Sequence, residues 1–177
     1  DANIDEKDWY LLDYQKGQGL PQAMLTHIRA GIHEAAKDPS SLLIFSGGET
    51  RAITGPVNEG SSYFRVADAL NLWEEPAKTM AIASASNVRA RTTAEEFATD
   101  SFQNLMFSIC RFKEVTGKYP TKITAISFSF KRRRFEHLHA AAIQWPAHLF
   151  NYIGTDPDAS TGFDLAKSTE GEYNNAA

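Results

Sequence analysis

Short apolar runs alternate with amphipathic stretches along the chain, and these two patterns predict strands and helices. The apolar runs lack polar alternation, which is typical of strands buried on both faces of a parallel sheet. Strands are predicted at 41–45, 79–83, 122–130 and 149–153, and helices at 20–37, 59–73, 92–117 and 132–144. The order predicts an α/β fold, a doubly wound Rossmann-like parallel sheet in a three-layer α/β/α arrangement.

Local signals place several helix ends. Asp38-Pro39 ends the first helix, because proline cannot continue it. Thr92 or Thr93, with Glu95 or Glu96 three residues on, reads as a Ser/Thr-x-x-Glu capping box, and Gly117 closes the same helix. The buried face of this helix is predicted to include Phe102, Leu105, Met106, Ile109 and Val115, and Cys110, near this face, is predicted to be a core residue.

The organisation predicted is one Rossmann-like domain at 20–158, between an N-terminal arm at 1–19 and a polar tail at 159–177. The arm reads as a short amphipathic helix or a folded-back segment. In a doubly wound fold the first helix normally follows a strand, and residues 1–19 do not offer one. We therefore expect a partner or a further segment to complete the sheet.

Four consecutive cations, Lys131 to Arg134, stand where the best predicted strand meets a helix. Free N–H groups and the dipole make a helix N-terminus favourable for anions and unfavourable for cations. An anionic ligand would offset that cost. Lys131 and Arg134 are i, i+3 neighbours and can face one site, while Arg132 and Arg133 are expected to point to solvent. The alternative interpretation is a solvated face or a localisation signal.

Two further loops follow predicted strands and carry polar groups. Ser46, Gly47 and Gly48 precede Arg51, and two glycines let the backbone approach a ligand closely with exposed N–H groups. A tight turn explains the glycines equally well. The loop 84–93 holds Arg89 and Arg91 among small polar residues, and its alternative interpretation is a polar loop with a helix cap.

Composition narrows the function classes. The 177 residues hold 18 Lys+Arg against 22 Asp+Glu, a net charge of −4, which argues against a nucleic-acid binder. The single cysteine, Cys110, excludes an internal disulfide and a Cys-rich zinc site, and His137 and His139 lie on different helix faces, so no metal site is predicted. No apolar run approaches the ~20 residues that a membrane span needs. We expect a soluble protein, cytoplasmic rather than secreted, although a targeting segment upstream of Asp1 would be compatible with the sequence.

Four blocks in order resemble the SanA/ElyC/YdcF-like domain of unknown function 218, and specifically its fungal branch. They are Ser46-Gly47-Gly48, Asn58-Glu59-Gly60, Thr92-Thr93-Ala94-Glu95-Glu96, and the run from Ile126 to Phe135. The resemblance covers about residues 28–158. Lys131 stands where bacterial members usually carry His, and Glu96 where they carry Asn. The family also opens with a strand ending in glycine, which this chain lacks.

The resemblance implies a Rossmann-like site for a small anionic or nucleotide-like ligand at the carboxyl ends of the strands. One bacterial member is reported to bind S-adenosylmethionine, which makes this molecule the candidate cofactor; others are linked to cell-envelope metabolism. The implied ligand-binding residues are Ser46, Gly47, Gly48, Arg51, Thr93, Lys131 and Arg134, and the implied acid–base groups are Glu59 and Glu95.

Two functions of different classes remain open from the sequence. The first is a transferase or hydrolase that acts on a phosphorylated or nucleotide-like small molecule, with a carboxylate beside the cations. The second is a non-catalytic binding module, or one that depends on a partner because its site is incomplete. The missing first strand and the absent family histidine favour the second.

Overall fold

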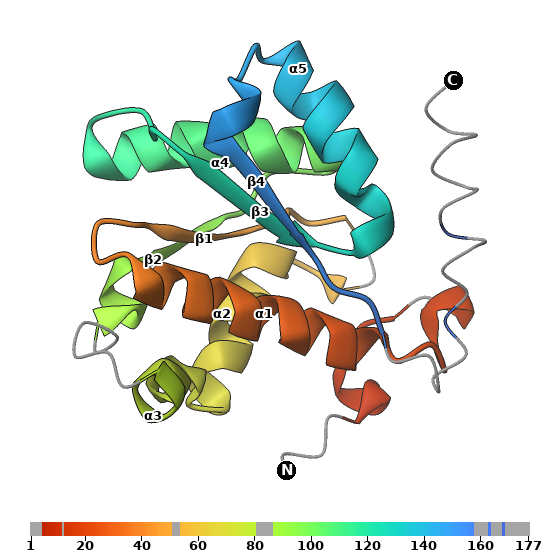
Figure 1. The fold of residues 1–177 in the computed structure, drawn as a ribbon. Coiled ribbons are helices and arrows are strands. Elements are labelled where there is room, and N and C mark those ends of the chain that lie inside the picture. Colours follow the sequence, from red (N-terminus) through yellow and green to blue (C-terminus); the bar gives the residue numbers. More distant parts are fainter. Residues whose placement is uncertain are drawn as a thin grey trace. The chain divides into compact units, whose positions relative to one another are not determined.

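The computed structural model describes residues 5–11, 13–50, 54–80, 87–157, 163 and 168. The chain forms two compact units. We call residues 28–121 the central unit and residues 1–27 with 122–177 the terminal unit. Figure 1 shows the helices and strands of both units.

The helix α1, Leu20–Lys37, has the bounds that the sequence predicted, and it crosses from the terminal into the central unit after His27. Arg91 of the central unit binds its carboxyl end. The guanidinium donates to the carbonyl of Ala35 at 2.8 Å and to the carbonyl of Ser41 at 2.8 Å. A cation there satisfies carbonyls that the helix leaves unpaired and complements its dipole.

The central unit is a β-α-β arrangement. Its strands β1, Leu43–Ser46, and β2, Thr92–Glu95, pair in parallel, with Ser46 opposite Glu95. The connection contains α2, Glu59–Ala69, the 3-10 turn η4, Leu72–Glu74, and α3, Glu75–Met80. A further 3-10 turn, η6, Arg89–Arg91, leads into β2, and α4, Ser101–Thr116, follows it.

Helices cover both faces of this strand pair. Phe45 of β1 makes ring contacts with Tyr63 of α2 and with Trp73, whereas the next residue, Ser46, reaches Asn104 of α4. Neighbouring residues of a strand face opposite sides, so α2 and α4 lie on the two faces. The central unit is therefore locally three-layered, as Figure 1 shows for α2, β1 and α4.

The terminal unit contains a second parallel pair, β3, Ile123–Ser127, and β4, Phe150–Gly154. A nearly continuous helical segment joins them: the 3-10 turn η7, Ser129–Lys131, the π-helical η8, Arg134–His139, and α5, Ala140–Ala142, followed by the turn η9, Ala147–Leu149. The predicted N-terminal arm holds the 3-10 turns η1, Glu6–Asp8, and η2, Asp13–Gln15.

Aromatic packing holds the helical segment on β4. Phe135 and Tyr152 are buried, and their ring centroids lie 5.4 Å apart. The Tyr152 hydroxyl donates to the carbonyl of Phe128 at 2.7 Å, which fixes the loop after β3. The end of β3 is thus held against β4 by a buried ring and a hydrogen bond.

The structure corrects two predicted elements. The capping box is wrong, because residues 92–95 form β2, while α4 begins at Ser101 with Asp100 as its cap. The Asp100 carboxylate accepts the N–H of Gln103 at 2.8 Å. The weak strand at 79–83 is wrong in its first two positions, which end α3; residues 81–83 lie outside the described residues.

The predicted burial of α4 also needs correction. Cys110 is exposed rather than part of the core, and Val115 is 48% exposed. Leu105 is buried as predicted, with 4% of its surface exposed. A 3.6-residue period identifies the helix but leaves the width of its buried stripe undetermined.

The fold is α/β with short parallel sheets. The described strands form two parallel sheets of two strands each. Of the helices in the described part of the chain, none is long and apolar enough to cross a membrane.

Candidate functional site

We compare the carboxyl ends of the two strand pairs, because ligands of parallel α/β sheets bind there. The central edge comprises the loops after β1 and β2 and the start of α2. The terminal edge comprises the loops after β3 and β4. The residues proposed from sequence divide between these two edges.

Glu95 is the centre of a buried network at the central edge. Only 4% of its surface is exposed, and one carboxylate oxygen accepts the Ser46 hydroxyl at 2.5 Å. The other oxygen accepts the N–H groups of Phe97 and Ala98 at 2.7 and 3.1 Å. The amide oxygen of Asn104 lies 2.8 Å from the same Ser46 hydroxyl. These contacts tie β1, β2 and α4 together and build the loop after β2.

The two glycines after β1 do not present free N–H groups. The N–H of Gly47 donates to the carbonyl of Glu95 at 3.0 Å, and that of Gly48 to the carbonyl of Ala98 at 2.7 Å. The interpretation of an exposed backbone cradle for an anion is therefore wrong at these positions. The alternative, a tight structural junction, agrees with the geometry.

Glycine is required at this junction by the close approach of three backbone segments. A Cβ on Gly48 would lie 2.9 Å from the carbonyl oxygen of Ala98. A Cβ on Gly60 would lie 2.6 Å from the carbonyl oxygen of Glu95 and 2.7 Å from that of Phe45. Gly60 sits in the first turn of α2, so its missing side chain lets this helix start directly on the ends of both strands.

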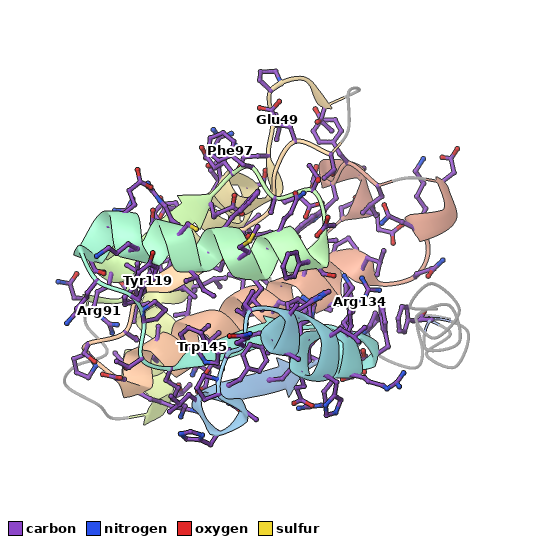
Figure 2. All side chains as sticks on the ribbon, turned by 90° about the horizontal axis from the view of Figure 1, so that it is seen from above. Glu49, Arg91, Phe97, Tyr119, Arg134 and Trp145 are labelled. Atoms are coloured by element: carbon purple, nitrogen blue, oxygen red, sulfur yellow. The ribbon has the colours of Figure 1, made fainter. Side chains whose placement is uncertain are left out.

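Described acidic side chains surround the central edge. Glu59 is half-buried and packs against Gly47. A Cβ added to Gly47 would lie 2.7 Å from the Cβ of Glu59. Glu49 and Glu96 are exposed, and Glu96 accepts the hydroxyl of Ser61. Phe97 is 79% exposed, and Figure 2 shows it with Glu49 at one end of the unit, away from Arg91. Arg51, the predicted cation of this loop, lies outside the described residues.

Three predicted polar groups of the central unit have structural partners. The Thr93 hydroxyl accepts from the guanidinium of Arg111 on α4 at 3.0 Å. Arg89 forms a two-contact pair with Asp68, at 2.7 and 2.9 Å, which lowers the pKa of that carboxyl mainly through the hydrogen bond. Arg91 caps α1. The interpretation of the loop 84–93 as a polar loop agrees with these contacts over residues 87–93, whereas its helix cap is wrong, because residues 92–95 form β2.

The terminal edge has a different character, because a cation lies over aromatic rings there. The ammonium of Lys131 is 5.6 Å from the ring centroid of Phe128 and 5.9 Å from that of Phe130. These two rings stack 5.4 Å apart at 18°, and Phe163 packs 6.1 Å from each. All of the rings are half-buried.

A polar cluster adjoins these rings. His27 packs edge-on against Phe128, with centroids 4.7 Å apart at 82°, and its Nε2 lies 3.2 Å from the carbonyl oxygen of Thr155. Asp156 accepts the N–H of Ser129 at 2.9 Å. Burial, and secondarily the charge of Lys131, lowers the pKa of His27 from its ordinary value, against the hydrogen bond and Asp156. Among the described residues, the buried hydroxyl of Thr155 has no hydrogen-bond partner.

The other cations of the tetrad follow the helical segment. Arg132 is exposed as predicted, but its guanidinium donates to the Tyr152 carbonyl at 2.8 Å and lies 5.0 Å over that ring. Arg134 is half-buried at the start of η8, and Figure 2 shows it at the opposite end of the segment from Trp145. The π winding changes the angle between successive residues, so faces inferred from a 3.6-residue period do not hold through η8.

Sequence reasoning missed His27, Thr155 and Asp156. His27 lies within the apolar pattern of α1, and the other two follow the last predicted strand without a recognisable motif. The position directly after a parallel strand was the available signal for Thr155 and Asp156. The part of the chain that the structure describes holds no group of three or more His, Cys, Asp or Glu that could bind a metal.

The sequence is similar to the "Uncharacterized protein YOR238W" of Saccharomyces cerevisiae. The two share 35% identity over 174 residues, which covers 84% of this chain and 57% of the yeast protein. The chain therefore spans 57% of the length of the curated relative that it matches. No family model and no solved structure matches the chain.

Proposed function

We propose that the protein binds a small anionic or nucleotide-like ligand at the terminal edge. The observation that carries the proposal is Lys131, a cation at the carboxyl end of β3, which lies over the stacked rings of Phe128 and Phe130. An ammonium supplies charge for a phosphate or carboxylate, and aromatic faces supply a surface for a planar base. Arg134 is the second proposed cation.

The resemblance to the SanA/ElyC/YdcF-like family supports the same ligand class and remains part of this proposal. A single doubly wound sheet that includes both strand pairs is also part of the proposal. S-adenosylmethionine, nucleotides and phosphorylated metabolites are the candidate ligands. Glu59 and Glu95 belong to the central edge, so acid–base chemistry there is a separate part of the proposal, and Glu59 is its better candidate, because it is half-buried at the start of α2. Glu95 already accepts three hydrogen bonds and is 4% exposed.

A non-catalytic binding module is the second candidate function. The engagement of Glu95 favours it, because a carboxylate that holds a loop together has fewer lone pairs for a substrate proton. The two functions differ in turnover. Incubation with S-adenosylmethionine or a nucleotide, followed by chromatography, distinguishes an enzyme that consumes the ligand from a module that returns it unchanged.

The binding test compares two lysines near the opposite ends of β3, Lys131 after its carboxyl end and Lys122 before its amino end. Isothermal titration calorimetry with S-adenosylmethionine, adenosine monophosphate and glucose 6-phosphate measures affinity for each class. We expect Lys131→Ala to weaken binding by about tenfold or more, since hydrogen bonds to charged groups contribute about 1.5–3 kcal/mol. Added salt should weaken wild-type binding as well.

Lys122→Ala is the matched control, because Lys122 is exposed and precedes the opposite, amino end of β3. It should leave affinity unchanged within twofold. Thermal melts of both variants confirm that the fold is retained. Equal losses in the two variants, or binding that Lys131→Ala does not affect, would contradict the assignment to the terminal edge.

A further inference from the structure

His27 and Lys131 both contact the ring of Phe128. The His27 imidazole packs against Phe128 at 4.7 Å, and the Lys131 ammonium lies 5.6 Å from the centroid of that same ring. His27 comes from α1, Phe128 and Lys131 from the loop after β3. Residues far apart in the sequence therefore meet at one place in the terminal unit.

The hydrogen bond of His27 fixes which nitrogen can gain a proton. A carbonyl oxygen only accepts hydrogen bonds, so the bond to Thr155 requires a hydrogen on Nε2. In the neutral ring Nδ1 then holds the lone pair. Protonation at Nδ1 charges the ring without breaking the contact with Thr155.

The charged groups near His27 have opposite effects on the protonation of its ring. Lys131 of η7 disfavours the imidazolium, and Asp156, which follows β4, favours it. Asp156 is held in place by the N–H of Ser129 at 2.9 Å. An anion bound at Lys131 would offset the lysine charge and add negative potential near the ring, which favours protonation of His27.

We propose that anion binding at the terminal edge is coupled to the uptake of one proton by Nδ1 of His27. The proposal rests on the proposed function, since it concerns the same edge. The proton comes from solvent, and no covalent bond of the ligand changes. Within the pH range of proton uptake, anion binding adds the imidazolium as a second positive charge, so the edge favours ligands with two negative charges, such as phosphate monoesters, over monocarboxylates.

The direction of the pH dependence follows from linkage. Above the His27 pKa of the ligand-bound protein, binding takes up no proton; below the lowered pKa of the free protein, the ring is already charged. Between these values affinity falls as pH rises, by at most about tenfold per pH unit for a single proton. The pH range of proton uptake begins below 6.5, the ordinary pKa of histidine, because burial lowers the pKa of His27 in the free protein.

Sulfate is the probe for the test, since it stays doubly charged over the range in which histidine titrates, about pH 5 to 8. The full chain is titrated with sodium sulfate in two buffers of different ionisation enthalpy, and the difference in measured heat gives the number of protons taken up. In parallel, NMR titration follows the His27 ring with and without saturating sulfate. We expect fractional proton uptake within that pH range and a higher His27 pKa in the sulfate-bound protein.

Three variants separate the linkage from folding. His27→Gln should still bind sulfate and should lose the proton uptake, while His33→Gln, on the same helix, should keep it. Asp156→Asn retains an acceptor for the Ser129 N–H and removes the negative charge, so it should move the pH range of proton uptake to lower pH. Sulfate binding without uptake in the wild type, or uptake that persists in His27→Gln, would overturn this inference alone. Absence of sulfate binding at every pH would overturn the proposed function as well.

Discussion

The central and terminal edges occupy equivalent places, each at the carboxyl ends of two parallel strands, yet they differ in how their polar groups are used. At the central edge the Glu95 carboxylate and the N–H groups of Gly47 and Gly48 are bonded within the unit. At the terminal edge a buried Thr155 hydroxyl has no partner among the described residues, and Lys131 lies over aromatic rings. Equivalent positions in the fold therefore differ in their hydrogen bonding, and the buried Thr155 hydroxyl distinguishes the terminal edge among the described residues.

Glycine does not cause this difference. Gly154 approaches Ser129 as closely as the central glycines approach their neighbours, since a Cβ there would lie 2.7 Å from the Ser129 Cα. Among the described side chains the charges differ. The central edge carries Glu49, Glu59 and Glu96, whereas the terminal edge carries Lys131 together with Asp156.

The largest expected effect is a loss of stability from a change at Gly60, where α2 starts on the ends of β1 and β2. Gly60→Ala would place a Cβ 2.6 and 2.7 Å from two carbonyl oxygens, and backbone cannot move aside as a flexible side chain can. We expect a loss of about 3 kcal/mol in the free energy of unfolding, measured by urea denaturation, because overpacking outweighs the better helix propensity of alanine.

Gly55→Ala is the control for this variant. Gly55 has a positive φ of 62°, and a Cβ added there would have no neighbouring atom within 4 Å, so only backbone strain applies. Its expected cost is about 1 kcal/mol. A neutral or stabilised Gly60→Ala protein would show that the three segments can separate, and the contrast between a closed and an available edge would fail.

A smaller effect tests whether Glu95 is structural. Glu95→Ala should cost about 2 kcal/mol, because it removes the acceptor of two N–H groups and of the Ser46 hydroxyl. Glu95→Gln should cost less, since the new amide can accept from the loop and donate to Ser46, whose hydroxyl then binds Asn104. Chemical denaturation of both variants gives the comparison.

Glu96→Ala is the neighbouring control, and we expect a change within about 0.5 kcal/mol for this exposed residue. If Glu95→Ala retained full stability but abolished turnover of a ligand, the catalytic interpretation of Glu95 would be the better one. That result would also make the central edge the functional one.

The sequence predicted the helices and strands that have strong local signals. The bounds of α1 agree at both ends, since an apolar period ends at Asp38-Pro39. Residues 92–95 were misread because Thr-Thr-Ala-Glu satisfies a capping pattern as well as a strand. The strand is chosen by its parallel pairing with residues 43–46, which lie far away in sequence.

The candidate site was predictable only in part, for the same physical reason. Lys131 could be identified because its position after a strand is a local property. The role of His27 could not, because it depends on contacts with Phe128 and Thr155, more than 100 residues away. The structural use of Gly47 and Gly48 likewise depends on Glu95 and Ala98 of the other strand's loop.

The smallest expected effect compares one hydroxyl from each unit. Thr155→Val removes a buried hydroxyl that has no partner among the described residues, and valine has nearly the same shape, so we expect the free energy of unfolding to rise by about 1 kcal/mol. Thr92→Val removes a hydroxyl that donates to the Val88 carbonyl at 2.8 Å, and it should lower stability by a similar amount. Opposite signs in urea denaturation would show that the Thr155 hydroxyl of the terminal edge, unlike the bonded hydroxyl of Thr92 at the amino end of β2, is buried without a partner. A loss of stability in Thr155→Val would instead show that a bound water or ligand group satisfies the hydroxyl in solution, and repeating the measurement with saturating sulfate would then identify whether the partner is the anion.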